Sequence, residues 1–154
     1  MVYIVIILVV IMLISPIAWM RPSPRQKQLV RLREYAGKQH LQVTIRRLSV
    51  QLQRRHDSPN MACYLKNHPR VKANNVKERP KWFVSVAGEF EWISRIDVEI
   101  ASQLKQICSQ LPAGCCYLEA EQDFVGVFWL EKGDEDKVDK IAKVINDVMQ
   151  LQNQ

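Results

Sequence analysis

Glycine is scarce in this sequence, with five residues among 154, and the five are scattered along the chain. Loops that cradle phosphate groups need several glycines at fixed spacing, because the backbone must approach the phosphates closely. No such spacing occurs here, and there is no internal repeat and no low-complexity tract. The sequence therefore argues against a nucleotide-binding enzyme and for one domain of ordinary size beside a membrane segment.

Motifs for metal ligands and for nucleophiles are also missing. The cysteines show neither C-x-x-C nor disulfide-scaffold spacing, and the histidines form no H-x-x-x-H pair; they are Cys63, Cys108, Cys115, Cys116, His40, His56 and His68. Structural zinc sites and cysteine nucleophiles depend on such arrangements. We therefore expect a non-enzymatic protein with no catalytic residue, metal, cofactor or small-molecule substrate. Free thiols are typical of a reducing compartment. An enzyme with a scattered active site is the least favoured alternative.

Charged side chains are absent from the first twenty residues. The run Val2–Met20 would reach roughly 28 Å as a helix, close to the ~30 Å hydrocarbon core of a bilayer. Tyr3 and Trp19 stand near its ends, where amphipathic aromatics favour the interface, and Pro16 would kink or end the helix. The run predicts a transmembrane anchor over residues 1–20. A cleaved signal peptide is the alternative, but it requires a basic start, a shorter apolar region and small residues at the cleavage site.

Positive charge follows the apolar run abruptly. The cations that we expect to fix the topology are Arg21, Arg25, Lys27, Arg31 and Arg33. They lie within about 20 residues of the run, the distance over which the positive-inside rule applies. We expect them to place the amino terminus outside and the carboxyl-terminal domain in the cytoplasm, in a single-pass inner-membrane protein. The bilayer and its anionic headgroups are the first expected partners.

The two halves of the remaining chain carry opposite charge. Residues 21–81 hold 16 Lys and Arg against 3 Asp and Glu, whereas residues 82–154 hold 6 against 13. The basic region 46–81 favours, as an alternative function, a membrane-tethered module that binds nucleic acid. No helix-turn-helix or RNP-type signature accompanies that region, and a membrane-facing surface explains the same charge. Nucleic acid is therefore the less favoured partner.

Hydrophobic periodicity predicts an α+β fold. A basic juxtamembrane helix is expected within residues 21–40, with Ser23 as N-cap and Gly37 as its stop. Period-2 alternation predicts strands at 41–48 and 61–66 and hairpins at 81–93 and 115–131, and period 3.6 predicts helices after Asp97 and Gly133. The cytoplasmic domain, residues 41–154, should therefore be a small, mostly antiparallel sheet packed on one face with two or three helices.

Aromatic residues gather on these predicted strands. Adjacent aromatics such as Trp82 and Phe83 point to opposite faces of a sheet, so some of them are expected to be exposed. Most should serve the core, but exposed ones would mark a binding face. Trp82, Trp92 and Trp129 are our candidates for contact with a membrane-protein partner.

Two segments resemble known bacterial proteins. The sequence MRP at 20–22 followed by RQK at 25–27 resembles the start of the YajC-type accessory subunit of the preprotein translocase, which has a short outside terminus, one span and a basic cytoplasmic helix. The sequence GVFWLEKG at 126–133 resembles a GV-x-W-x-E-x-G segment in a group of small inner-membrane proteins of unknown function. This chain lacks the translocase subunit's Gly-Asp and Gly-Gly turns and is longer. The resemblance implies an envelope context and an accessory or scaffolding role associated with protein export.

Overall fold

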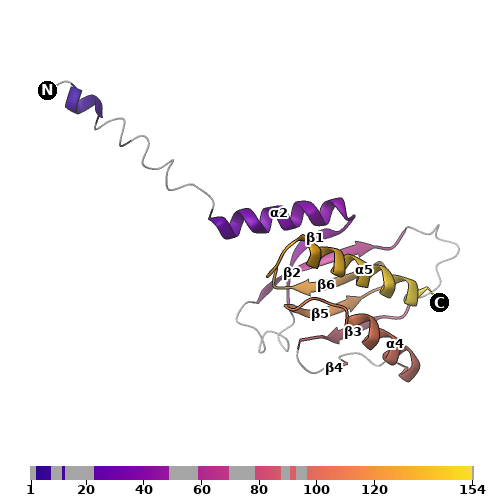
Figure 1. Cartoon of the computed structure of the whole chain (residues 1–154). Coiled ribbons are helices and arrows are strands. Elements are labelled where there is room, and N and C mark those ends of the chain that lie inside the picture. The colour runs from indigo at the N-terminus through magenta and orange to yellow at the C-terminus, as the bar shows by residue number, and fades with distance from the viewer. Residues whose placement is uncertain are drawn as a thin grey trace. The chain divides into compact units, whose positions relative to one another are not determined.

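A computed structural model describes residues 3–7, 12, 23–48, 59–69, 79–87, 91–92 and 97–153 (Figure 1). The chain divides into two units, Met1–Arg31 and Leu32–Gln154. The division falls inside helix α2 (Pro24–Lys38), so the second half of that helix belongs to the larger unit.

The expected anchor lies mostly outside the described residues. Of the run Val2–Met20, the structure describes only residues 3–7 and 12, and the Tyr3 side chain is exposed. Pro16, Trp19 and Arg21 are not among the described residues. Within the ranges that are described, the structure contains no helix with both the length and the apolar character that a membrane crossing requires.

Helix α2 begins where the sequence predicts and ends later. The Ser23 amide donates to Oε1 of Gln26 at 2.9 Å, and the Gln26 amide donates to the Ser23 hydroxyl at 3.2 Å, which is a capping box. The helix extends one residue beyond the expected stop at Gly37, to Lys38. The left-handed residue is His40, at φ 59°, and the amide of Leu41 donates to the carbonyl of Ala36 at 2.9 Å. These bonds form a Schellman motif without glycine.

The larger unit is built on one antiparallel sheet of six strands in the order β1-β2-β6-β5-β3-β4. The strands are β1 (Gln42–Arg47), β2 (Asn60–Asn67), β3 (Trp82–Ser85), β4 (Glu91–Trp92), β5 (Cys115–Ala120) and β6 (Phe124–Trp129). Every neighbouring pair is antiparallel. The predicted α+β class and antiparallel sheet are therefore confirmed.

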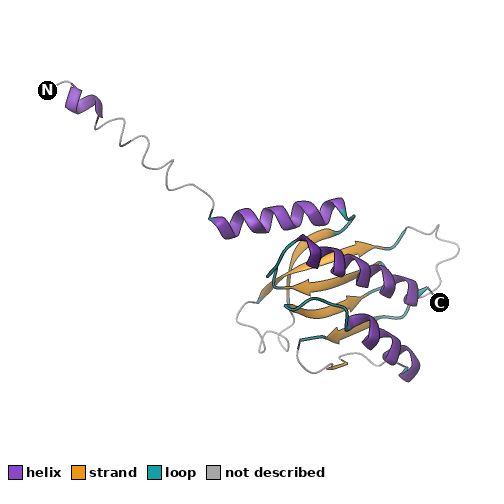
Figure 2. Ribbon diagram, in the orientation of Figure 1, coloured by secondary structure: helices purple, strands orange, loops and turns teal. Residues whose placement is uncertain are grey.

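Two further helices lie across the sheet, α4 (Val98–Cys108) and α5 (Glu135–Gln152) (Figure 2). The acidic residues Glu135 and Asp136 occupy the first turn of α5, where they suit the positive end of the helix dipole. All the buried apolar residues of α2, α4 and α5 belong to a single core cluster, which they form with one face of the sheet. One face is thus packed against helices, as the sequence predicts.

Strand alternation divides the side chains of the sheet between two clusters. On β6, Val125, Val127 and Trp129 join the helix-side core, whereas Phe124 and Phe128 belong to a second cluster on the opposite face. Gly126 allows β6 to approach β2 closely, because an added Cβ would lie 2.8 Å from Sγ of Cys63. The second face is therefore tightly packed at its centre.

Candidate functional site

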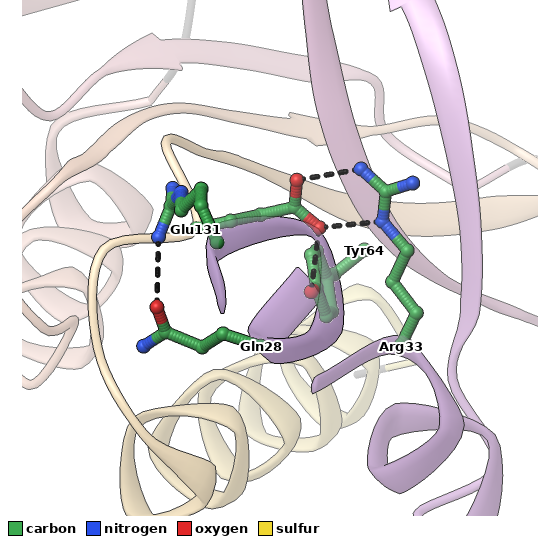
Figure 3. Close-up of polar contacts among 5 residues, drawn as sticks. Gln28, Arg33, Tyr64 and Glu131 are labelled. Carbon is green, nitrogen blue, oxygen red and sulfur yellow. Dashed lines mark hydrogen bonds and ion pairs between the residues drawn. The ribbon is translucent and has the colours of Figure 1, made fainter. Parts of the chain in front are cut away.

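A carboxylate lies at the end of the central strand β6. Glu131 is almost fully buried, and its Oε1 and Oε2 accept hydrogen bonds from Nε and Nη2 of Arg33 at 2.8 and 2.7 Å (Figure 3). The Tyr64 hydroxyl donates to Oε1 at 3.0 Å. Three elements therefore meet at one carboxylate: the second half of α2, β2, and the segment after β6. We call Arg33, Tyr64 and Glu131 the carboxylate cluster.

Local backbone geometry directs Glu131 inward. The alternation of β6 places Trp129 on the helix side, and Glu131, two residues later, continues on that side at φ 54°. A left-handed φ is unfavourable for a residue with a Cβ, so its surroundings must hold it there. The Leu130 amide donates to the Gly114 carbonyl at 3.0 Å, and the Tyr64 ring packs edge-on against Trp129 with centroids 5.4 Å apart.

The electrostatics of the carboxylate cluster favour one protonation state. The hydrogen bond to Glu131 raises the pKa of Arg33 above its ordinary value, although burial opposes this. Burial, together with the Glu131 charge, raises the pKa of Tyr64. Arg33 therefore remains charged and the Tyr64 phenol remains neutral at physiological pH. Both carboxylate oxygens are already bonded, so the arrangement is suited to fastening α2 to the sheet rather than to transferring a proton.

A second ion pair lies on the opposite face of the sheet. Arg46 on β1 donates to the Glu119 carboxylate on β5 at 2.5 Å, and its guanidinium lies 5.0 Å from the centroid of the Phe124 ring. Burial raises the pKa of Glu119, and the Arg46 charge opposes that rise. Lys81 and Glu121 form a third, more exposed pair at 3.1 Å. The basic first half and the acidic second half of the chain therefore partly neutralise each other within the fold.

Hydrogen bonds between polar side chains and backbone carbonyls hold the carboxyl-terminal end of α5 in place. His68 Nε2 lies 2.9 Å from Oε1 of Gln152, and the Gln152 amide nitrogen donates to the carbonyls of Pro80 and Glu121 at 2.7 and 3.3 Å. Because that amide nitrogen is the donor, the Gln152 oxygen must accept, and Nε2 of His68 carries the proton. Nδ1 of His68 is then a buried acceptor that has no hydrogen-bond partner among the described residues. Burial lowers the pKa of His68, the Gln152 hydrogen bond opposes this, and the nearby Arg79 charge adds to the lowering.

All four cysteines are buried and reduced. Burial raises the pKa of Cys63, Cys108 and Cys115 to about 12, and it also raises that of Cys116. A thiol needs to lose its proton to act as a nucleophile or to bind a metal. These cysteines are therefore core residues whose thiols remain protonated and unreactive at neutral pH. Within the described ranges there is no group of three or more side chains able to hold a metal ion.

Two of the three tryptophans proposed for partner binding are buried. Trp82 is 3% exposed and Trp129 is 0% exposed, and both belong to the helix-side core. This corrects the expectation of exposure: both point toward the helix-covered side of the sheet, which alternation alone could not identify. Trp92 is on β4, and its side chain lies outside the described part of the chain.

The predicted topology cations divide into two groups. Arg25, Lys27 and Arg31 are exposed on α2, whereas Arg21 lies outside the described residues. Arg33 belongs to the carboxylate cluster, because Nε and Nη2 on one edge of its guanidinium donate to Glu131. A sequence signal for this was present: Glu131 falls on the same strand side as the apolar Val127 and Trp129. An acid at an inward position requires a buried partner.

Comparison with protein-family models, curated proteins and solved structures finds no match to this chain.

Proposed function

We propose that this chain is a single-pass inner-membrane protein whose cytoplasmic α+β domain is a non-enzymatic accessory or scaffolding subunit of a membrane complex. One observation carries the proposal: the uncharged run Val2–Met20 is followed at once by a basic segment. Such a run favours insertion into the bilayer, and the cations after it resist translocation. The exposure of Arg25, Lys27 and Arg31 supports a role beside anionic headgroups.

The non-enzymatic part of the proposal is supported by how the polar side chains are used. Both oxygens of Glu131 are bonded, and burial keeps the thiols protonated. A catalytic group needs a side chain that can reach and exchange a proton or electron pair with a substrate. The resemblance of residues 20–27 to a translocase accessory subunit supports a place near protein export.

The nucleic-acid alternative receives less support from the described residues. Arg46 and Lys81, at the two ends of the basic region, are bound to Glu119 and Glu121. Arg79 donates to Oδ1 of Asn153 and to the carbonyl of Gln122. Cations engaged in this way contribute less to phosphate binding, which depends on available positive charge.

Topology is the first experiment. A reporter that is active only in the cytoplasm, fused after Gln154, should be active in the full chain. Replacing Arg21, Arg25, Lys27 and Arg31 with glutamine should reduce that activity and expose the domain outside, because the charge bias that sets orientation is lost. The matched control replaces Lys140 and Lys143, which are exposed on α5, and should leave the reporter unchanged. Equal effects from both sets would contradict the proposal.

Capture from membranes tests the accessory role. Mild crosslinking before detergent extraction should recover the full chain together with defined membrane-protein partners. If the chain were repeatedly recovered alone while the reporter confirmed the topology, the membrane anchor would be supported but the proposed subunit role would be contradicted.

A further inference from the structure

Strand β1 forms one edge of the sheet among the residues that the structure describes. Strand β1 is terminal in the strand order and pairs only with β2. Its register with β2 is continuous from Gln42 to Arg47, without a bulge. Within the described part of the chain, no backbone hydrogen bond to residues 42–47 comes from outside β2. On an edge strand, about half of the backbone groups point away from the neighbour and can bind another strand.

Strand β1 carries few of the usual protections of an edge strand. Natural edges carry charged side chains, proline, a bulge or a very short strand, which discourage pairing with another chain, and β1 has only the charges of Arg46 and Arg47 at its end. Strand β1 has six residues, no proline and no lysine. Ile45, at its centre, is 56% exposed, and it is one of few large apolar side chains exposed in the described domain. An open and partly apolar edge of this kind is suited to a partner strand.

The charges along β1 select the partner. Arg46 is already paired with Glu119, but the neighbouring Arg47 is exposed. The stretch from Gln39 to Leu48 contains no acidic residue. In an antiparallel pair with β1 of a second copy, centred on the strand, Arg47 would lie opposite Gln42 and would find no carboxylate on the facing strand. An acidic strand from another protein would complement this edge.

We propose that β1 binds an extended acidic segment of a partner protein by antiparallel strand addition. Val43 packs against the helix-side core, so alternation places Ile45 and Arg47 on that same side. The partner strand runs in the opposite direction and meets Arg47 first. Its expected pattern is an acidic residue followed two and four residues later by apolar residues. This inference rests on the proposed accessory function and names the chemistry of the partner.

A peptide titration tests the inference with the full chain in a mild non-ionic detergent. The probe is a fluorescein-labelled ten-residue peptide. Threonine occupies every second position, and one glutamate, followed two and four residues later by valines, stands between the threonines. Two further peptides have the same sequence with N-methyl groups on alternate amides. In one peptide the methylated amides lie on the edge that would face β1, and in the other they lie on the opposite edge. Only the peptide methylated on the edge away from β1 should bind like the parent, because the other cannot complete the ladder of hydrogen bonds.

Variants of β1 test the side-chain pattern. Arg47→Glu should weaken binding of the glutamate peptide by up to about fivefold and strengthen binding of a lysine counterpart, because a cross-strand ion pair becomes a repulsion. Ile45→Thr should weaken binding by about threefold while keeping a β-branched side chain. Val98→Thr is the matched control, because Val98 is 88% exposed on α4, and this change should not alter the affinity.

Three outcomes would overturn the inference. Equal binding of the two methylated peptides would exclude strand addition, and an unchanged charge preference in Arg47→Glu would exclude the register. A homodimer that Ile45→Thr dissociates in sedimentation would make a second copy the occupant of the edge. These failures are distinct from failure of the membrane anchor, which the reporter fusion detects independently.

Discussion

Arg33 and Glu131 lie 98 residues apart in the sequence, yet the guanidinium of one binds both carboxylate oxygens of the other, at 2.8 and 2.7 Å. The two side chains differ in their contact with water: that of Arg33 is 39% exposed and that of Glu131 is 8% exposed. The carboxylate is therefore the group that depends on its partner. This asymmetry predicts which half of the pair is more costly to remove.

Arg33→Ala should lower the free energy of unfolding by about 2 kcal/mol, because it leaves a buried carboxylate with only the Tyr64 hydrogen bond. This value is below that of a fully buried pair, since water screens the exposed part of Arg33. Urea unfolding of the full chain in detergent measures the loss. Arg25→Ala, an exposed change on the same helix, should cost less than about 0.5 kcal/mol. Similar losses in the two variants would show that the ion pair does not fasten α2.

The stability of the protein should depend on pH through His68. Burial lowers its pKa below the ordinary value of 6.5, so between those two values the unfolded chain binds more protons than the folded one. The free energy of unfolding should therefore fall as the pH is lowered from about 7.5 to 5.5. Urea midpoints at several pH values follow this change.

Two variants separate His68 from other titrating groups. His68→Gln cannot titrate but keeps a nitrogen donor for Gln152, and it should flatten the pH dependence. His40→Asn alters an exposed histidine in the left-handed turn after α2, where asparagine is tolerated. It should keep the slope of the wild-type chain. If the free energy of unfolding of His68→Gln still changed steeply with pH, a titrating group other than His68 would be responsible for the pH dependence.

The thiols should react only after unfolding. Cys63, Cys108 and Cys115 are buried, and burial raises the pKa of each to about 12, so access and thiolate population are both low. We expect an aromatic disulfide reagent at pH 7.5 to label the native chain slowly and all four cysteines rapidly in denaturant. Mass spectrometry of peptides identifies each labelled thiol. Fast labelling of any of these three cysteines in the native chain would contradict their burial.

Gly126→Ala should destabilise the centre of the sheet by about 1–3 kcal/mol, because the new Cβ would lie 2.8 Å from Sγ of Cys63. Cys63→Ala removes that sulfur and should recover part of the loss in the double variant. Gly37→Ala is the control, because a Cβ there meets nothing within 4 Å and alanine favours helix. It should raise stability by up to about 1 kcal/mol. Additive effects at Gly126 and Cys63 would exclude the steric contact.

Local features of the fold could be predicted from the sequence. The periodic run Val138–Leu151 becomes the buried face of α5, and the turn at Gln122–Asp123 joins β5 to β6. The start of α2 was predictable because Ser23 is a favourable N-cap residue and Pro24 suits the first helical position. These features depend on residues close together in the chain, where propensity and periodicity act directly.

Features that join distant parts of the chain could not be predicted in the same way. Strand alternation shows that Trp82 and Phe83 point to opposite faces, but it does not show which face the helices cover. The partner of Glu131 is fixed by the path of α2 over the sheet, and no spacing rule connects it with Arg33. The left-handed turn at His40, after the end of α2, was missed because glycine is the usual left-handed residue, whereas here hydrogen bonds hold a histidine in that conformation.

The strand order has a consequence for biosynthesis. Ala62 on β2 pairs with Trp129 on β6, so an amino-terminal strand must await a neighbour that the ribosome makes 67 residues later. At about 5–20 residues per second, that interval is roughly 3 to 13 s. During this time β1 and β2 form at most a two-stranded ribbon, which is marginally stable in water. The nascent chain therefore completes its sheet only after the β5–β6 hairpin has emerged, and until then its first two strands lack their central neighbour.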